Sequence, residues 1–554
     1  MPKLSTHRFR LAAALLLVCS LAPAARAQAP ASVTGRVTDG ERGVAGVTVA
    51  LVSNEPAQRL RAAARAKTDA EGRYLLSNAA PGRYHVVPYA PAFVVQGLSN
   101  SFPPGRPLTL LAGEEVKDID FRVERGAVIT GRVTDADGNP VVAEAVMIAP
   151  AEVDAQTAMR STFDLRDQLT DDRGVFRLYG LPPGRYRVSV GQAGEEAGAV
   201  GYGRRKIFQR TYHPGVTEQA QARVVEVRAG EEAENVDITL GRPIKTYRAA
   251  GRFVYAETGQ PVPNVAFAYG TLDASGRRVG TFGAGQATNA RGEFQTEGLA
   301  PGRYAVYNMP GPEGSEFYSE PSTFEVVDGD VTGLVVRLRR GASVSGVVVV
   351  EGAADRATAA RLLAQVRVYG FVESRGQMSP PFSQRPTQVN PDGGFVLAGL
   401  RPGKLRLGAG NDAAKGLSLS RVELNGANVT PGLDIAEGAQ LTGVRVVLVY
   451  GTGVITGQIS FVNGAPPAAS RVIAQARRAG TPAPEGPGRS VEADVRGFFR
   501  IEGLPAGDYQ VIVNVYGGGQ MQRSEPLNVS VGDGGEARVA PVIDFNRGPR
   551  GGTP

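Results

Sequence analysis

A spacing of ten residues between two glycines occurs five times along this chain and constrains its fold more than any other feature. The first glycine ends an Asp/Asn-x-x-Gly turn, and Tyr or Phe follows two residues later. The second lies in a corner, Pro-Gly in four copies and Ala-Gly in the fifth. The pairs are Gly72 and Gly82, Gly174 and Gly184, Gly292 and Gly302, Gly393 and Gly403, and Gly497 and Gly507. Successive corner glycines lie 101 to 118 residues apart, so each pair marks one repeat of ordinary domain size.

The segments around these glycines predict β-strands. Asp or Asn begins a turn, and glycine adopts the positive φ that the turn needs. The strand after the corner alternates with period two, as in Tyr186, Val188 and Val190. Every repeat also opens with a glycine-containing strand, such as 34–37, and closes with an alternating strand, such as 119–123. No long, capped helical pattern occurs, so the chain is predicted to be an all-β tandem array of five β-sandwich domains.

The order of these motifs resembles the carboxypeptidase regulatory-like domain. The segments 180–188, Gly-Leu-Pro-Pro-Gly-Arg-Tyr-Arg-Val, and 298–306, Gly-Leu-Ala-Pro-Gly-Arg-Tyr-Ala-Val, are most similar to its corner motif. The resemblance implies a Greek-key, seven-strand, transthyretin-like β-sandwich, which is often grouped with carbohydrate-binding-like folds. Because this fold serves in adhesion, scaffolding, sugar binding and as an accessory to enzymes, it does not by itself indicate a function.

The N-terminal segment has the pattern of a signal peptide. Lys3, Arg8 and Arg10 precede an apolar stretch at 11–21, and the small residues of Ala25-Arg-Ala27 follow it. Val18 before Cys19 argues against lipoprotein processing. We therefore expect export to the periplasm, the outer envelope or the medium. The expected segments are 1–27 (signal peptide), 28–124 (repeat 1), 125–241 (repeat 2, with an insertion), 242–340 (repeat 3), 341–450 (repeat 4), 451–546 (repeat 5) and 547–554 (a disordered tail).

Net charge and composition limit the classes of partner that the mature chain is expected to bind. The net charge is +7, and 1–27 contributes four basic residues and no acid, which leaves +3. So small a net charge on more than 500 residues does not favour binding to nucleic acid. The single cysteine, Cys19, lies in the segment expected to be removed, so disulfides and cysteine chemistry are not expected. No later stretch is long and apolar enough to span a membrane.

The sequence predicts no catalytic residue, no cofactor and no metal site. A zinc carboxypeptidase needs a His-x-x-Glu pair, but Pro88 and Val216 stand three residues after His85 and His213. His85 alternates outward on its strand, and we predict that it faces solvent. The segment 135–139 begins like a calcium loop, but its glycine comes too early and Val146 occupies the twelfth position. It is interpreted as a hairpin turn.

The most unusual segment is the insertion at 191–223 in repeat 2, where cations and aromatic residues alternate. Such a segment is either a solvated loop with one ordinary strand or a binding edge. The candidate ligand-binding residues are Tyr202, Arg204, Arg205, Tyr212 and His213. Three hypotheses remain open: a non-catalytic array that binds an unknown protein or cell-envelope glycan, a carbohydrate-binding protein, and an accessory subunit of a secreted or envelope hydrolase or transporter.

Overall fold

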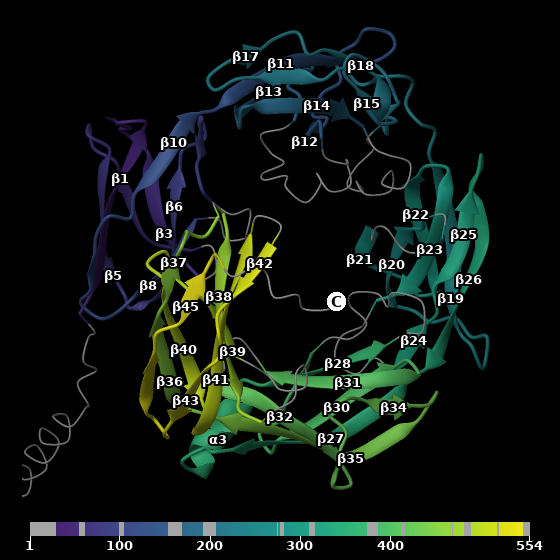
Figure 1. The fold of residues 1–554 in the computed structure, drawn as a ribbon. Coiled ribbons are helices and arrows are strands. Elements are labelled where there is room, and N and C mark those ends of the chain that lie inside the picture. The colour runs from purple at the N-terminus through teal and green to yellow at the C-terminus, as the bar shows by residue number, and fades with distance from the viewer. Residues whose placement is uncertain are drawn as a thin grey trace, which may run out of the picture.

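The chain folds into five β-sandwiches that follow one another around a closed circuit (Figure 1). The computed structural model describes residues 29–546 except 55–60, 99–104, 153–168, 192–205, 274, 277–281, 310–315, 374–385, 411–415, 468, 481–488 and 518–519. In Figure 1 the purple first repeat lies beside the yellow fifth repeat. The predicted tandem array of β-sandwiches is confirmed, and the array closes on itself.

The first two repeats contain β1 to β18. The strands of repeat 1 are β1 (Ala31–Asp39), β2 (Arg42–Gly43), β3 (Thr48–Ser53), β4 (Ala62–Lys67), β5 (Arg73–Ala79), β6 (Gly82–Tyr89), β7 (Phe93–Val95), β8 (Arg106–Leu110), β9 (Glu115–Val116) and β10 (Phe121–Arg125). Those of repeat 2 are β11 (Ala127–Thr134), β12 (Val146–Pro150), β13 (Val175–Leu181), β14 (Gly184–Val190), β15 (Thr211–Tyr212), β16 (Val225–Val227), β17 (Glu232–Ala233) and β18 (Ile238–Thr239). A 3-10 turn, η5 (Gln219–Gln221), follows β15.

The remaining repeats contain β19 to β45 and one described α-helix, α3 (Arg356–Leu363). The strands of repeat 3 are β19 (Tyr247–Tyr255), β20 (Ala266–Thr271), β21 (Phe282–Ala287), β22 (Glu293–Leu299), β23 (Gly302–Asn308), β24 (Phe317–Ser319), β25 (Ser322–Val326) and β26 (Val331–Arg340). Those of repeat 4 are β27 (Ala342–Glu351), β28 (Arg367–Glu373), β29 (Thr387–Gln388), β30 (Gly394–Leu400), β31 (Gly403–Gly410), β32 (Leu417–Leu424), β33 (Ala427–Asn428), β34 (Leu433–Ile435) and β35 (Gln440–Tyr450). Those of repeat 5 are β36 (Gly453–Gln458), β37 (Ser460–Val462), β38 (Arg471–Arg478), β39 (Arg489–Glu492), β40 (Phe498–Leu504), β41 (Gly507–Gly517), β42 (Gln520–Arg523), β43 (Leu527–Val531), β44 (Glu536–Val539) and β45 (Val542–Asp544).

Every repeat uses the same two-sheet topology. In the first sheet the opening strand pairs antiparallel with the strand after the turn and parallel with the closing strand, as β1 does with β5 and β10. The second sheet contains the strand after the corner, and in repeat 1 its order is β4-β3-β6-β8. Each pair of sheets encloses its own hydrophobic cluster. The five sandwiches therefore have separate cores.

The turn glycines adopt the conformation that the sequence predicts. Gly72, Gly174, Gly292, Gly393 and Gly497 have φ between 71° and 90°. In the first turn Asp69 Oδ1 accepts hydrogen bonds from the N–H groups of residues 71 and 73, at 3.0 and 2.7 Å. These bonds lower the pKa of Asp69, the bond from residue 73 having the largest effect. The aromatic residue after each turn is buried, as predicted.

The glycine of each opening strand lets the closing strand approach. A Cβ on Gly35 would lie 2.2 Å from the carbonyl oxygen of Ile119 and 2.8 Å from the hydroxyl of Tyr74. A Cβ on Gly131 would likewise lie 2.1 Å from the carbonyl oxygen of Val236. Because no larger side chain fits these contacts, this glycine sets the spacing between the first and last strands of a repeat.

The tyrosine after the corner both packs in the core and closes the corner. The hydroxyl of Tyr304, which is completely buried, donates a hydrogen bond of 2.8 Å to the carbonyl of Ala300, four residues earlier. The tyrosines of repeats 1, 2 and 5 donate to the equivalent carbonyl. In repeat 4 the position holds Leu405, which is also completely buried but has no hydroxyl. This hydrogen bond is a feature that period-two alternation alone does not predict.

Three of the four links between consecutive repeats begin at a glycine that follows directly on the closing strand. These glycines are Gly126, Gly341 and Gly451. The N–H of Gly126 donates to the carbonyl of Ala92 in repeat 1 at 3.0 Å. A Cβ on Gly126 would lie 2.4 Å from the Cα of Gly180 in repeat 2. The link is therefore held by both neighbours, which fixes the angle between the two repeats.

The link between repeats 2 and 3 is different. It is longer, and Gly241 has open space around the position of a Cβ. Ile244 in this link donates its N–H to the carbonyl of Ile207 at 2.6 Å. Ile207 and Ala300, one from each repeat, pack together with Ile244. At this link, apolar packing between the two repeats replaces the close glycine contact seen at the other three links.

Candidate functional site

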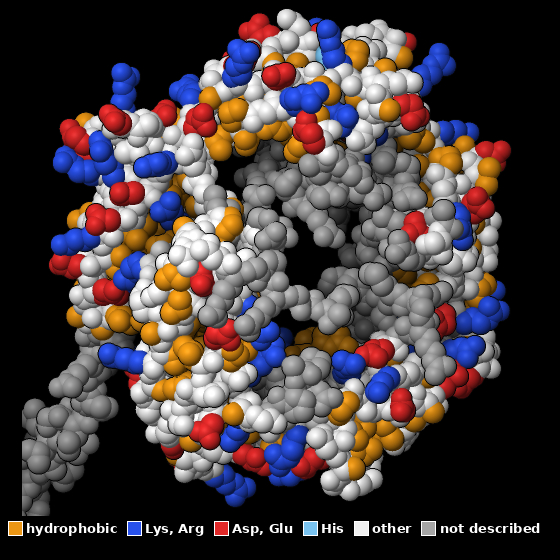
Figure 2. Space-filling model, viewed as in Figure 1, with side chains coloured by type: hydrophobic (Ala, Val, Ile, Leu, Met, Phe, Trp, Pro, Cys, Tyr) orange, Lys and Arg blue, Asp and Glu red, His pale blue; other side chains and the backbone are white. Residues whose placement is uncertain are grey.

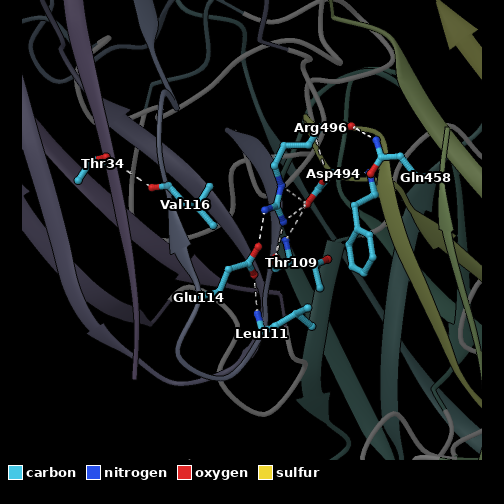
Figure 3. A network of polar contacts seen from close by, with 9 residues as sticks. Thr34, Thr109, Leu111, Glu114, Val116, Gln458, Asp494 and Arg496 are labelled. Atoms are coloured by element: carbon cyan, nitrogen blue, oxygen red, sulfur yellow. Dashed lines mark hydrogen bonds and ion pairs between the residues drawn. The ribbon is translucent and has the colours of Figure 1, made fainter. Parts of the chain in front are cut away.

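Repeats 1 and 5 are joined by a cluster of polar contacts between β8 and the turn before β40 (Figure 3). We call this cluster the clasp, and it consists of Pro107, Thr109 and Glu114 of repeat 1 with Asp494, Val495 and Arg496 of repeat 5. The N–H of Val495 donates to the carbonyl of Pro107 at 3.1 Å. The N–H of Thr109 donates to Asp494 Oδ2 at 3.4 Å, and Arg496 Nη2 donates to the carbonyl of Thr109 at 2.8 Å. Both backbone and side chains therefore cross from one end of the chain to the other.

Arg496 binds one carboxylate from each repeat. Its Nη1 lies 2.6 Å from Glu114 Oε1, and its Nη2 lies 2.7 Å from Asp494 Oδ2. The Asp494 side chain is only 1% exposed, whereas those of Glu114 and Arg496 are 25% and 31% exposed. Glu114 is held in place because its Oε2 accepts the N–H of Leu111 at 2.8 Å. Charge-assisted hydrogen bonds between such pre-positioned groups are among the stronger polar contacts in proteins.

The residues that repeat 5 contributes to the clasp belong to the Asp/Asn-x-x-Gly turn that every repeat contains. In repeat 2 the equivalent pair, Arg173 and Asp171, has an N–O distance of 3.2 Å, with side chains 75% and 40% exposed. Among the described residues, neither member of that pair forms a hydrogen bond or ion pair with another repeat. In repeat 5 the neighbouring β8 covers the turn and buries the carboxylate. Position in the circuit, and not local sequence, therefore gives the fifth turn its role.

His85 lies on the same face of repeat 1, and its predicted exposure to solvent is wrong. It points away from its own core, as the alternation of β6 indicates, but it is only 3% exposed. Burial lowers its pKa, with a smaller raising effect from Glu492 and a smaller lowering effect from Arg471, both in repeat 5. Its Nδ1 has no hydrogen-bond partner. Repeat 5 covers a face that would be exposed in a separate sandwich.

The candidate residues of the repeat 2 insertion are divided by the structure. Tyr202, Arg204 and Arg205 lie outside the described residues. Tyr212 and His213 are 8% and 6% exposed, and Tyr212 is part of β15, which pairs with β14. His213 Nδ1 lies 2.7 Å from the carbonyl oxygen of Asp237. The ring faces and hydrogen bonds expected to serve a ligand at these two residues instead serve the packing of repeat 2.

Arginines at other boundaries also form hydrogen bonds or ion pairs between neighbouring repeats. Arg489 of repeat 5 donates through Nη2 to the carbonyl of Leu417 in repeat 4 at 2.7 Å. Arg339 of repeat 3 pairs with Glu437 of repeat 4 at 2.9 Å. Sequence reasoning missed these roles because each arginine lies among many others on exposed strand ends.

An aromatic pair on repeat 4, the exposed Phe371 and the half-buried Tyr369, is not singled out by any pattern in the sequence. Phe371 on β28 is 60% exposed, and its ring centroid lies 5.5 Å from that of Tyr369 in an edge-on arrangement. A Cβ on Gly408 of β31 would lie 2.2 Å from the Tyr369 ring, so that glycine leaves room for the tyrosine. Arg406 lies opposite Phe371 in register and pairs with Glu373 at 2.8 Å. A stacking face with hydrogen-bonding groups beside it therefore lies on the second sheet of repeat 4.

A cavity of about 510 Å³ lies against the first sheet of repeat 3. Its lining includes Gly251 and Arg252 of β19 and the turn residues Asn289 and Glu293. Asn289 Nδ2 donates to Glu293 Oε2 at 2.9 Å, so these two groups hold each other. The lining consists of the shared opening strand and turn and adds no chemistry of its own.

Among the described residues, no cluster of three or more His, Cys, Asp or Glu residues is placed to hold a metal ion. Asp135, the start of the calcium-like segment, accepts the N–H groups of Asp137 and Asn139 and forms a turn. In the same residues no helix has the length and hydropathy that crossing a bilayer requires. Figure 2 shows basic and acidic side chains interspersed over the viewed face.

Comparisons with known proteins place one repeat in a family. The model of the carboxypeptidase regulatory-like domain matches residues 32–123, but no curated protein matches the chain. Among solved structures, the chain is similar to a streptococcal ancillary pilin, with 12% identity and a TM-score of 0.24 over 56% of this chain and 99% of that chain. It is also similar to the Bacillus anthracis TIE protein, with 11% identity and a TM-score of 0.16 over 81% and 80% of the two chains.

A third similar structure is GBS52, the minor pilin of Streptococcus agalactiae, with 12% identity and a TM-score of 0.21 over 39% of this chain and 96% of that chain. Likenesses this weak say nothing about function. The family match is specific, because residues 32–123 contain the opening strand, the turn, the corner and the closing strand of repeat 1. The chain therefore contains a carboxypeptidase regulatory-like domain at residues 32–123, as its motifs predict.

Proposed function

We propose that this chain is a non-catalytic, exported structural protein whose ring of sandwiches displays surfaces to protein or cell-envelope partners. The observation that carries the proposal is the clasp, because it joins the two ends of the chain and makes the ring a single frame. The links at Gly126, Gly341 and Gly451 support it, since closely packed links fix each repeat against the next. Both described histidines are buried, and His213 contacts the backbone of its own repeat.

For the binding surface we propose the three insertion residues Tyr202, Arg204 and Arg205. Changing all three to Ala should remove most binding to a partner captured from envelope extract, because cation and stacking contacts are lost together. Thermal unfolding should change little, because the three residues belong to an insertion outside the shared strand pattern and substitutions away from core features usually cost about 0.5 kcal/mol or less. Tyr212 is left unchanged because it is buried. The measurement is capture by the wild-type and triple-variant proteins, with thermal unfolding of both as the control.

If the triple variant captured the partner as fully as the wild-type protein, the binding surface would lie elsewhere on the ring. Turnover of a peptide, ester or glycoside substrate that a single substitution abolishes would contradict the non-catalytic part of the proposal. These assays should be run with and without added zinc, because the family is named after a zinc enzyme.

A second candidate function, carbohydrate binding, is supported by the exposed ring of Phe371, which packs edge-on against the half-buried Tyr369. An exposed ring offers a face for stacking, and the neighbouring Arg406 and Glu373 offer hydrogen bonds to hydroxyl groups. Replacing Phe371 with Ala should therefore abolish any signal of the wild-type protein on a glycan array. Val396, which is 55% exposed on the first sheet of the same repeat, provides the matched control. A glycan signal that survives Phe371→Ala would exclude this face.

A further inference from the structure

The contact between repeats 1 and 5 differs from every other boundary in the circuit. Consecutive repeats are covalently linked, whereas repeats 1 and 5 are held only by noncovalent contacts between segments about 385 residues apart. The clasp is polar, and its central cation binds two carboxylates. Polar contacts of this kind can open without unfolding either sandwich, because each sandwich has its own hydrophobic core.

A buried histidine lies beside this contact. His85 pairs in register with Val52 of β3 and Pro107 of β8, neither of which carries a charge. The apolar residues Ala50, Val52 and Val87 form a small buried cluster next to the same strand. His85 is as buried as these residues, at 3% exposure, and its Nδ1 has no hydrogen-bond partner. The neutral ring is tolerated there, but nothing is provided to solvate a proton on that nitrogen.

The charged groups that face His85 across the boundary do not compensate for a proton. They are Arg471 of β38 and Glu492 of β39. Arg471 Nε and Nη2 each donate to Glu492 at 3.2 Å, so this carboxylate is already neutralised by its own cation. The remaining charges of the clasp, Glu114, Asp494 and Arg496, are bound to one another. A positive charge on His85 would therefore be buried next to an arginine without a free acid.

We propose that the clasp is a pH-sensitive latch that keeps the ring closed at neutral pH and loosens when His85 takes up a proton. The proposal concerns the shape of the ring and does not depend on what the ring binds. An acidified environment would then convert a closed frame into an open chain of sandwiches. In the open form the second sheet of repeat 1 would be exposed, including the apolar cluster beside His85.

The direction of the pH effect follows from the two states. In the closed ring, burial holds the pKa of His85 below its ordinary value of 6.5. In the open form His85 meets water and regains a pKa near 6.5. The open form therefore binds the proton more tightly, so closure is most stable above about pH 6.5 and weakens as the pH falls below it. Between pH 7.5 and 5.5 the closure constant should fall by up to about tenfold, the maximum for one group whose open-state pKa is 6.5.

Hydrogen exchange at the clasp measures this constant even when opening is rare. The N–H groups of Thr109 and Val495 donate across the boundary, so their protection from exchange reports closure. In the full chain, their protection factors, corrected for the intrinsic pH dependence of exchange, should fall by several-fold, up to about tenfold, from pH 7.5 to 5.5. The same correction applied to the turn of repeat 2, residues 171–175, should give no change.

Two substitutions at His85 and one control decide the proposal. His85→Gln should make the protection of Thr109 and Val495 independent of pH in this range, and His213→Gln should leave the wild-type response. If Gln itself opens the clasp, His85→Val supplies an apolar side chain like its neighbours Val52 and Val87 and should close it without pH dependence. Unchanged protection in the wild-type protein, or a pH-dependent fall that persists in His85→Val, would overturn the proposal.

Discussion

Arg496→Ala is expected to weaken closure of the ring about a hundredfold at neutral pH. The substitution leaves the carboxylates of Glu114 and Asp494 facing each other, and Asp494 is only 1% exposed. Removing one partner from a largely buried, hydrogen-bonded charge cluster costs about 2–5 kcal/mol. We expect about 3 kcal/mol, because the arginine itself is partly exposed, and each 1.4 kcal/mol corresponds to a factor of ten. The protection factors of the Thr109 and Val495 amides measure the loss.

The matched control is Arg173→Ala in repeat 2. Arg173 occupies the same turn position and pairs with the equivalent aspartate, but both side chains are well exposed. Exposed ion pairs of this kind contribute about 0–1 kcal/mol, so clasp protection should not change and the stability of repeat 2 should change little. Equal effects of the two substitutions would show that the ion pair stabilises the turn and not the contact between repeats 1 and 5.

Tyr304→Ala is expected to destabilise repeat 3 by roughly 3–5 kcal/mol. Tyr304 is completely buried, its ring stacks on Phe324 with a centroid distance of 5.5 Å, and its hydroxyl closes the corner at Ala300. The substitution thus removes a large side chain from the core and one hydrogen bond. Hydrogen exchange followed repeat by repeat should show the loss concentrated in repeat 3, because each sandwich has its own core.

Tyr304→Phe separates the contribution of the buried ring from that of the hydroxyl hydrogen bond. It keeps the ring and loses only the hydroxyl, so it should cost about 1 kcal/mol. The buried Leu405 of repeat 4 shows that the corner folds without this hydroxyl. Faster exchange in all five repeats after Tyr304→Ala would contradict independent cores.

The features of one sandwich could be predicted from the sequence because they are local. The turn at Asp69 and Gly72, the buried aromatic after it and the alternation after the corner depend on residues within a few positions of each other. The direction in which His85 points is local too, and it was predicted correctly. Its burial is not local, because it depends on a sandwich nearly 400 residues further along the chain. For the same reason no pattern distinguished Asp494 and Arg496 from their equivalents in other repeats.

One feature of the sequence does mark the links between repeats. The first glycine of the Gly-Leu-x-Pro-Gly corner meets the preceding link in repeats 2 and 4, where Gly180 and Gly399 lie against Gly126 and Gly341. Repeat 1 holds Asn78 at this position, with φ of 59°. Asparagine tolerates this left-handed conformation but not the close contact. In repeats 2 and 4 the glycine therefore also meets a packing requirement between repeats, whereas Gly298 of repeat 3 has open space around it.

The fixed links also restrict how a gene for such a protein can change. In open arrays, unequal recombination between similar repeats adds or removes units at little cost, because each unit contacts only its neighbours. Here three of the four links are fixed by close contacts at a glycine, and the fifth sandwich lies where Arg496 meets Glu114. A duplicated unit would carry the last sandwich past the first, and a deleted unit would leave it short. We therefore expect variation among related chains to accumulate in surface loops while the number of repeats stays at five.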